Sequence, residues 1–321
     1  MRIGLVTDSL SSASFDEMLD TAARLGIEDV EFATGGWSEA RHINVDLLLS
    51  DAKERDRFSG AVRHRGLTIS ALNANGNQLH PVIGGRVDDI VRKTVELAGL
   101  MGIDTVVLMS GLPGGGAQDL VPNWVTTSWP PETQTILKYQ WDEVALPYWH
   151  DLADHGRRSD VRFAVEMHGA QLVYNVTTLL RLREAIGGIV GANLDPSHLM
   201  WMGADPRMVA RALSGAIHNV HAKDVRFQSH VADVNGVLGA QPPEQAADRP
   251  WNYVTLGLGY PGGAQFWGQF LTDLRTSGYD GTLSIEHEDV EMDATEGVAQ
   301  TASLLKSVLL VKPPSWKPAT I

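Results

Sequence analysis

Hydrophobic and polar positions along this chain repeat with two different periods in turn. Short apolar runs, typical of buried strands, occur at residues 3–6, 30–32, 67–71, 105–109, 162–165, 190–194, 217–220 and 282–285. Between them, apolar residues recur every three or four positions, as on one face of a helix, at 15–25, 45–65, 87–101, 177–186, 206–213, 266–276 and 294–309. The pattern therefore predicts strands and helices that alternate along the whole chain.

The first of these helices shows a signal at each end. Ser14 and Glu17 have the spacing of a capping box, in which the two side chains satisfy backbone N–H groups at the start of a helix. Gly26 follows the last apolar position and supplies a stop. The sequence thus predicts a helix that begins after Ser14 and ends before Gly26.

Eight strands that alternate with helices, with no break in composition, indicate a single α/β domain over residues 1–311. We expect a parallel (β/α)₈ TIM barrel. A doubly wound open sheet is the alternative, because a count of strands does not show that the sheet closes. Residues 312–321 form a proline-rich tail, which either docks on a neighbouring subunit or is a loosely ordered end.

Two connections are longer than ordinary strand-to-helix loops. They cover residues 111–135, after the fourth strand, and residues 225–264, after the seventh. Long connections in compact domains commonly serve as lids or interfaces. Because both follow strands, we expect both on the carboxyl-terminal face of the barrel, where TIM-barrel active sites lie.

Composition and charge narrow the classes of partner. The chain has 321 residues, a formal net charge of −13 and no cysteine. The lack of cysteine excludes disulfides and thiolate ligands and fits a reducing cytoplasm. An acidic chain without a basic run repels a phosphate backbone, so we expect no nucleic acid partner. No stretch approaches the roughly 20 apolar residues that cross a bilayer, and the first residues lack a secretory signal. We therefore expect a cytoplasmic protein with a small-molecule partner.

The fifth to eighth strands each end in a side chain that can bind a metal ion. These residues are Glu166, Asp195, His221 and Glu286. Carboxylates that converge in one barrel mouth need a counter-charge, because burying an unpaired carboxylate is strongly unfavourable. A shared divalent cation supplies that charge; four independent surface or salt-bridged residues are the alternative. Three carboxylates and one imidazole favour Mn²⁺ or Mg²⁺, with Co²⁺ and Zn²⁺ also compatible.

The stretches around these residues carry a resemblance to a known family. "VEMHG", "NLDPSH", "HAKD" and "SIEHED" are similar, in order and strand placement, to motifs of the xylose-isomerase-like sugar isomerase and epimerase family of TIM barrels. The resemblance covers essentially the whole chain. It implies that Glu166, Asp195, His221 and Glu286 bind one divalent metal and that the substrate is a sugar or polyol. In the family's ketose epimerases the first and last glutamates also exchange protons with carbons beside the carbonyl, which makes Glu166 and Glu286 candidate catalytic residues.

Three further histidines lie close to these motifs. His198, three residues after Asp195, is a candidate catalytic residue that hydrogen-bonds a substrate hydroxyl, or else an ordinary turn residue. His168 is a candidate substrate contact. His168 and His287 both neighbour a predicted ligand, and at least one of them is expected to be an ordinary packed or solvated histidine.

Charged residues also follow His221. Lys223 and Arg226 are candidate substrate contacts, and Asp224 is a candidate partner of the metal ligands. A salt bridge within the loop explains these residues equally well.

Three tryptophans surround the first long connection: Trp124, Trp129 and Trp141. Tryptophan is commonly a core or interface residue, yet its ring also stacks on sugars and aromatic groups. Trp124 and Trp129 are therefore candidate substrate contacts.

The predicted centre supports more than one reaction. A cation that binds a sugar carbonyl stabilises the enolate formed when a neighbouring C–H bond loses its proton. Return of the proton to the other face gives epimerisation, return to another carbon gives isomerisation, and loss of a group from the β carbon gives elimination. The predicted metal ligands are compatible with all three outcomes.

The two long connections carry a second, narrower resemblance. "NWVTTSWPPETQTILKYQWDE" and "VADVNGVLGAQPPEQAADRPW" are similar to segments of the large subunit of bacterial C-glycoside deglycosidases. This resemblance implies a metal-dependent carbon–carbon lyase that acts on 3-oxo-glycosides of aromatic aglycones together with a small second subunit. A ketose or 3-keto-sugar epimerase or isomerase is the alternative.

Two other classes fit the sequence less well. The endonuclease branch of this barrel requires more histidine ligands and a basic surface, whereas this chain is acidic. The second class is a non-catalytic sugar-binding protein, which has no need of all four predicted metal ligands.

Overall fold

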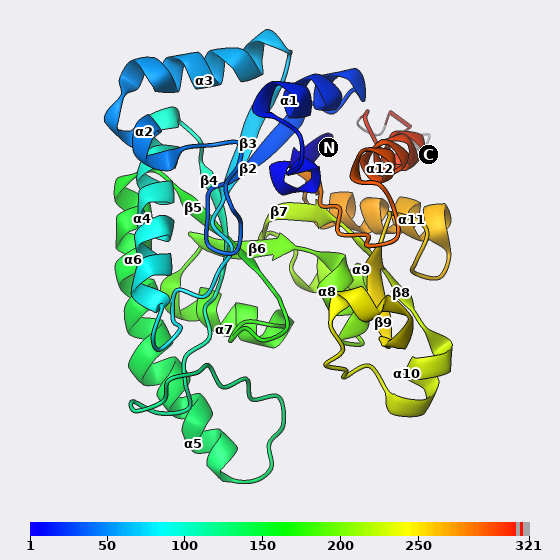
Figure 1. Ribbon diagram of the computed structural model, residues 1–321. Helices are drawn as coiled ribbons and strands as arrows, with labels where there is room; N and C mark the ends of the chain where they lie inside the picture. Colours follow the sequence, from blue (N-terminus) through cyan, green and yellow to red (C-terminus); the bar gives the residue numbers. More distant parts are fainter. Residues whose placement is uncertain (313–314, 317–321) are drawn as a thin grey trace, which may run out of the picture.

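The computed structural model describes residues 1–312 and 315–316. Eight parallel strands form a closed barrel in the order β1-β10-β7-β6-β5-β4-β3-β2 (Figure 1). They are β1 (Arg2–Val6), β2 (Asp29–Ala33), β3 (Thr68–Asn73), β4 (Thr105–Met109), β5 (Arg162–Glu166), β6 (Val190–Leu194), β7 (Ile217–Ala222) and β10 (Thr282–Ile285). Gly4 of β1 pairs with Asp29 of β2 on one side and with Ser284 of β10 on the other. The predicted TIM barrel is therefore confirmed, and the open sheet is wrong.

Helices follow the strands and surround the barrel (Figure 1). The longer ones are α1 (Phe15–Arg24), α3 (Ala52–His64), α4 (Gly84–Met101), α6 (Leu146–Arg158), α7 (Val176–Ile186), α11 (Gly263–Thr276) and α12 (Ala294–Val308). Shorter helices are α2 (Val45–Ser50), α5 (Glu132–Lys138), α8 (Pro196–Trp201), α9 (Pro206–Ala212) and α10 (Ser229–Asn235). The capping box is present: the side chain of Ser14 accepts a hydrogen bond from the backbone of Glu17, and Glu17 accepts one from the backbone of Ser14. Gly26 has the left-handed conformation (φ 63°) that ends such a helix.

Two parts of the helix prediction are wrong. The helix expected over residues 45–65 is broken at Asp51, whose backbone is extended (φ −126°, ψ 109°) and whose side chain caps α3 through the N–H groups of Lys53 and Glu54. Between β4 and β5 the sequence predicted a long connection over residues 111–135 and no helix, whereas the chain forms α5, a π-helical turn at Tyr139–Ala145 and α6. Pro147 interrupts the sequence of this helical segment but lies in the first turn of α6, where proline is tolerated.

The inside of the barrel is polar near the carboxyl ends of the strands. Five buried residues from different strands form what we call the polar floor: Glu31, Asn73, Asn193, Asn219 and Ser284. Glu31 accepts hydrogen bonds from the other floor residues Asn73, Asn219 and Ser284 at 2.8–2.9 Å. Apolar side chains fill the layer between strands and helices, as where Trp149 of α6 packs edge-on against Phe163 of β5. This arrangement places polar side chains beneath the mouth of the barrel.

The two long connections differ in structure. The first runs without helix or strand from residue 110 to 131, before α5. The second contains an antiparallel pair, β8 (Asp224–Phe227) and β9 (Trp251–Val254), with α10 between them. Both extend from the barrel toward the lower part of the view in Figure 1.

No helix among residues 1–312 is both long and apolar enough to cross a membrane. The hypothesis that the proline-rich tail docks on a neighbour falls mainly on residues 313–314 and 317–321, which lie outside the described residues.

Candidate metal centre

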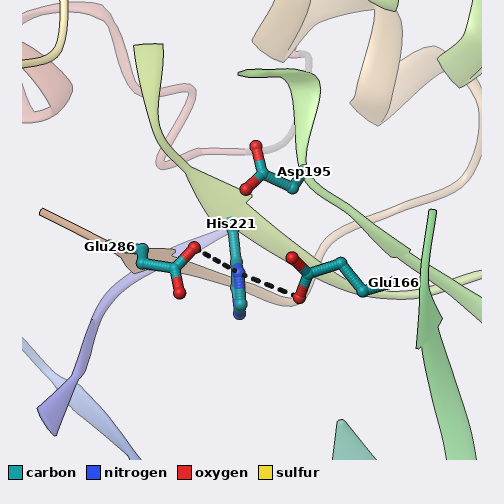
Figure 2. A group of neighbouring side chains, drawn as sticks. All are labelled: Glu166, Asp195, His221 and Glu286. Carbon is teal, nitrogen blue, oxygen red and sulfur yellow. Dashed lines mark hydrogen bonds and ion pairs between the residues drawn. The ribbon is translucent and has the colours of Figure 1, made fainter. Parts of the chain in front are cut away.

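Four side chains from neighbouring strand ends face one another in the mouth of the barrel (Figure 2). Glu166 is the last residue of β5, Asp195 directly follows β6, His221 lies in β7, and Glu286 directly follows β10. One ligand atom of each residue lies within 4.8 Å of the ligand atoms of the others. Since all strands of the barrel point the same way, their carboxyl ends bring the four residues together.

These residues fit a divalent cation. Glu166 and Asp195 are 1% exposed and His221 is fully buried, so the carboxylates are shielded from water. Oδ2 of Asp195 is buried and lies 3.2 Å from Nε2 of His198 and 3.7 Å from Nζ of Lys223, while Oδ1 accepts from the backbone of Ser197. Three carboxylates that converge on one buried space favour a bound cation in addition to the positive side chains nearby, and the oxygen-rich donor set suits a hard or borderline ion.

Glu31 orients the imidazole of His221 from the polar floor. Nε2 of His221 lies 3.0 Å from Oε1 of Glu31, whereas Nδ1 lies 3.1 Å from Glu286 and 3.6 Å from Glu166. Nε2–H therefore donates to Glu31, and Nδ1 is the atom available to a metal. Burial disfavours the charged imidazole, but Glu31 and Glu286 raise the pKa of His221 well above its usual value, so protons and a cation compete for this position.

His198 connects Glu166 to the second long connection. Its Nε2 lies 2.9 Å from Oε1 of Glu166, and its Nδ1 lies 2.8 Å from the hydroxyl of Tyr253 in β9. Burial disfavours the charged form of His198, but Asp195 and Glu166 outweigh it and raise the pKa to about 9. His198 is therefore a buried cation, and its two N–H groups donate to Glu166 and Tyr253. Asn75 and Asn193 donate to the other oxygen of Glu166 at 2.8 and 2.9 Å.

Lys223 brings a second positive charge to the centre. Its Nζ lies 3.0 Å from Glu286, 2.7 Å from Glu288 and 4.3 Å from the centre of the Tyr253 ring. Burial opposes the charge of Lys223, but Glu286 and Glu288 raise its pKa well above the usual value. The ammonium group therefore stays charged at the mouth of the barrel and partly balances the carboxylates.

The match to a known family covers most of the chain. Residues 19–308 match the family described as "Xylose isomerase-like TIM barrel". The chain belongs to this family.

One protein is similar in sequence over nearly the whole chain. The uncharacterized protein YfiH of Bacillus subtilis (strain 168) is 47% identical over 313 residues, 96% of this chain and 99% of that protein. Solved structures share the fold at low identity. The probable 3-DHS dehydratase AsbF of Bacillus anthracis has a TM-score of 0.67 at 15% identity, over 95% of this chain and 99% of its own. The IOLI protein with a bound zinc atom has a TM-score of 0.66 at 15% identity, over 96% and 98%. A D-tagatose 3-epimerase-like protein has a TM-score of 0.63 at 18% identity, over 96% and 98%.

In the present chain, a cavity of about 210 Å³ lies over the metal centre. Its lining includes Glu166, His168, His198, Lys223 and Glu286. Nδ1 of His168 is hydrogen-bonded to the carbonyl of Gly169. Burial lowers the pKa of His168 to about 3, so its ring is neutral and its Nε2 is a hydrogen-bond acceptor. The cavity is large enough for one small sugar.

Two charged candidates after His221 lie outside this cavity. Arg226 does not line it, and its guanidinium pairs with Glu291 on the surface. Asp224 is buried and accepts backbone hydrogen bonds from Gly257 and Tyr260 at 2.8 and 2.9 Å. Asp224 therefore holds the second connection in place rather than a metal ligand.

The tryptophans of the first connection are also separate from the metal cavity. Trp124 lines a different cavity, Trp129 is 73% exposed, and Trp141 is buried. His287 does line the metal cavity, and Gly297 of α12 makes room for it, because a Cβ there would lie 2.0 Å from the ring.

Sequence reasoning missed Glu31 and Tyr253. Glu31 has a signal, a carboxylate inside the apolar run Val30 to Phe32, because alternate residues of a barrel strand face the barrel interior or the apolar helix layer, and a carboxylate suits only the interior. Tyr253 has none, because it reaches His198 only through the pairing of β8 with β9, which the polar insertion does not reveal.

Proposed function

We propose that this chain is a divalent-metal-dependent enzyme that removes a proton from the carbon beside a sugar carbonyl. One observation carries the proposal: Glu166, Asp195, His221 and Glu286 converge, with ligand atoms within 4.8 Å of one another, beneath a cavity of about 210 Å³. Membership of a family of sugar isomerases and epimerases supports it. A divalent cation, when bound there, supplies positive charge that polarises the carbonyl and stabilises the developing oxyanion.

The chain's own residues supply proton transfer and orientation. Glu166 and Glu286 lie on opposite sides of His221 (Figure 2), so their carboxylates reach a bound sugar from two sides. One takes the proton from carbon, and the other is placed to deliver a proton on the opposite side. The cationic Lys223, which lines the cavity, donates hydrogen bonds to sugar oxygens.

For the finer activity, our first proposal is a carbon–carbon lyase that acts on 3-oxo-C-glycosides. A base removes the proton from carbon 2, beside the 3-keto group. The electron pair of that C–H bond forms the double bond between carbons 1 and 2. The pair of the carbon 1–aglycone bond leaves with the aglycone, whose carbon takes up a proton. The resemblance of the two long connections supports this choice, and a probable dehydratase shares the fold.

Epimerisation of a free ketose or 3-keto sugar is the second proposal. The opposed placement of Glu166 and Glu286 favours it, because inversion needs proton removal from one face and return to the other. A D-tagatose 3-epimerase-like protein among the structural relatives supports it further.

Incubation of Mn²⁺-loaded protein in D₂O distinguishes these proposals. The substrates are a 3-oxo-C-glucoside of a phenolic aglycone and free ketohexoses. Release of the aglycone supports the lyase, whereas inversion of a free ketose with deuterium at the inverted carbon supports the epimerase. No deuterium exchange with any keto sugar would contradict proton abstraction altogether.

A matched pair of variants assigns the proton transfer. We expect Glu286→Gln to lower turnover about 100-fold or more, because the amide cannot accept the proton. Glu184→Gln removes an exposed carboxylate of α7, away from the centre, and should change turnover little. Metal content, measured for both, separates loss of the base from loss of the ion.

Manganese as the native ion, a small second subunit and a cytoplasmic location are further parts of the proposal. Substrate contacts through His168, Arg226, Trp124 and Trp129 also stay predictions. Of these four, only His168 lines the metal cavity.

A further inference from the structure

Trp37 lies at the mouth of the metal cavity, although the sequence did not predict it as a substrate contact. It follows β2, belongs to the lining of the cavity and is 57% exposed. The exposed part of the indole is therefore available to a molecule that enters the cavity.

The turn before Trp37 fixes the indole relative to the metal centre. Gly36 has a positive φ of 81°, and a Cβ on it would lie 2.2 Å from the carbonyl oxygen of Asn75. The backbone N–H of Trp37 donates to that same carbonyl at 2.8 Å. The side-chain amide of Asn75 in turn donates to Glu166 at 2.8 Å. Because one residue holds both the turn and a proposed metal ligand, the indole has a defined place beside the centre.

The cavity has an aromatic side and an acidic side. The ring centre of His168 lies 5.9 Å from that of Trp37 and 4.0 Å from that of His198, so three rings continue from the mouth toward the metal ligands. His168 follows β5, which lies across the closed barrel from β1. Asp8 follows β1, and Glu288 follows the adjacent strand β10. Both of these carboxylates line the cavity and are exposed at its mouth.

The mouth offers little positive charge to an anionic group. Among the described residues, Lys223 is the only lysine or arginine of the lining, and its ammonium group already pairs with Glu286 at 3.0 Å and with Glu288 at 2.7 Å. His198 is also a cation, but both of its ring nitrogens are hydrogen-bonded within the protein. Proteins bind phosphate groups mainly through arginine, lysine and backbone N–H groups. A phosphate at this mouth would instead meet Asp8 and Glu288.

We propose that Trp37 and Asp8 select a neutral, unphosphorylated sugar ring. The indole covers the C–H face of the ring, which is apolar, and Asp8 accepts hydrogen bonds from hydroxyl groups at the edge of the ring. The acidic mouth rejects a phosphorylated sugar by repulsion between like charges. The inference rests on the proposed function for the orientation of the sugar, because a carbonyl at the metal centre leaves the remaining carbons toward the mouth.

Saturation-transfer difference NMR with the full, Mg²⁺-loaded chain tests this selection. The probes are methyl β-D-glucopyranoside and its 6-phosphate, which have no carbonyl and therefore do not react. We expect the neutral probe to bind about tenfold more tightly than the phosphate. Trp37→Ala should weaken binding of the neutral probe about fivefold, because it removes the stacking surface. Asp8→Asn should reduce the preference for the neutral probe to about threefold or less, because it removes a negative charge from the mouth.

Two matched substitutions serve as controls. Trp316→Ala removes an indole that is 81% exposed, and Asp56→Asn removes an exposed carboxylate of α3. Neither residue lines the metal cavity, so both affinities should stay unchanged. Equal binding of the two probes by the wild type, or binding of the neutral probe by W37A as tight as that of the wild type, would overturn the proposal.

A kinetic measurement separates this inference from the proposed function. With a keto sugar that exchanges deuterium, W37A should raise KM about fivefold and change kcat less than about twofold, because the indole binds the ring away from the reacting carbon. Exchange with an unchanged KM in W37A would refute the role of Trp37 and leave proton abstraction intact. Binding that depends on Trp37, without exchange by the wild type, would refute proton abstraction and leave the sugar contact intact.

Discussion

Glu31 carries a negative charge into the polar floor, where it contacts His221 rather than the metal position itself. Its two oxygens accept hydrogen bonds from Asn73, Asn219 and Ser284 as well as from His221. A carboxylate behind a metal-binding histidine fixes the tautomer of the ring and makes the ligand nitrogen more basic. Glu31 is therefore a positioning residue of the proposed centre.

The substitution Glu31→Gln tests this role. The amide keeps the size of the side chain but loses the charge, so we expect metal affinity to fall about 10–100-fold. Competition with a fluorescent chelator measures the change. Glu28→Gln, which removes a charge from an exposed neighbour, is the matched control. Equal affinities in wild type and E31Q would contradict the role of Glu31.

His218 makes the free energy of unfolding depend on pH. Burial lowers the pKa of His218 to about 4, although its Nδ1 is hydrogen-bonded to the carbonyl of Phe163. The folded protein therefore holds this ring neutral, whereas the unfolded chain protonates it below about pH 6.5. The stability from His218 is present above pH 6.5 and is lost as the pH falls toward 4.

Urea unfolding of His218→Asn at pH 7 and pH 4 measures this contribution. The asparagine amide preserves the hydrogen bond to Phe163 but does not titrate. We expect the variant to lose about 2 kcal/mol less stability than the wild type over this range, with allowance for partial exposure of the ring. His64→Asn, on an exposed face, serves as control. A pH dependence identical to that of the wild type would refute the assignment.

At the level of elements, the second connection is part of the site rather than a cover over it. β9 supplies Tyr253, whose hydroxyl accepts from His198, and its ring lies beneath Lys223. The antiparallel pair β8–β9 starts directly after Lys223, so its geometry follows from the end of β7. Asp224 fixes that start through four N–H donors: the backbones of Val225, Gly257 and Tyr260 and the indole of Trp267.

Asp224→Asn is expected to destabilise this element. All four groups around the carboxylate are donors, so an amide NH₂ in its place faces N–H groups and leaves at least one of them unpaired. We expect a loss of about 2–4 kcal/mol in the free energy of unfolding. Asp233→Asn, on the exposed helix α10, is the comparison. Equal unfolding midpoints in the two variants would show that Asp224 does not anchor the connection.

The sequence predicted some elements well and others poorly, for physical reasons. The strands and α1 were predictable because apolar spacing and capping residues act locally. The break at Asp51 was not, because apolar spacing continues across it while only the backbone turns. Tyr253 and Glu31 were missed as site residues, since their contacts join positions 55 and 190 residues apart in the sequence.

For the whole molecule, the order of elements along the chain predicted the parallel strands and the meeting of Glu166, Asp195, His221 and Glu286, while closure of the barrel had an open sheet as its alternative. All eight strands run in one direction, so a residue's place at the end of its strand already determines its place in the mouth. The positions of Arg226 and the tryptophans were not predictable, because they depend on the course of long connections.

A bound cation should stabilise the whole chain. Its ligands come from four strands that meet only in the folded state, so an ion at 100 times its dissociation constant contributes about 2.7 kcal/mol. For a chain of this size we expect Mn²⁺ to raise the melting temperature of chelator-treated protein by roughly 3–6 °C. Differential scanning calorimetry measures the shift, and Asp195→Asn should reduce it. A shift of the same size in D195N would count against the site.

The closure of the barrel has a consequence for how the protein is made. β10 is the last strand to leave the ribosome, and it joins β1, the first strand made, to β7. Glu286, directly after β10, completes the ligand set at that same moment. A chain that stops before β10 therefore has neither a sealed sheet nor the fourth proposed ligand, so we expect truncation ahead of Glu286 to abolish metal binding.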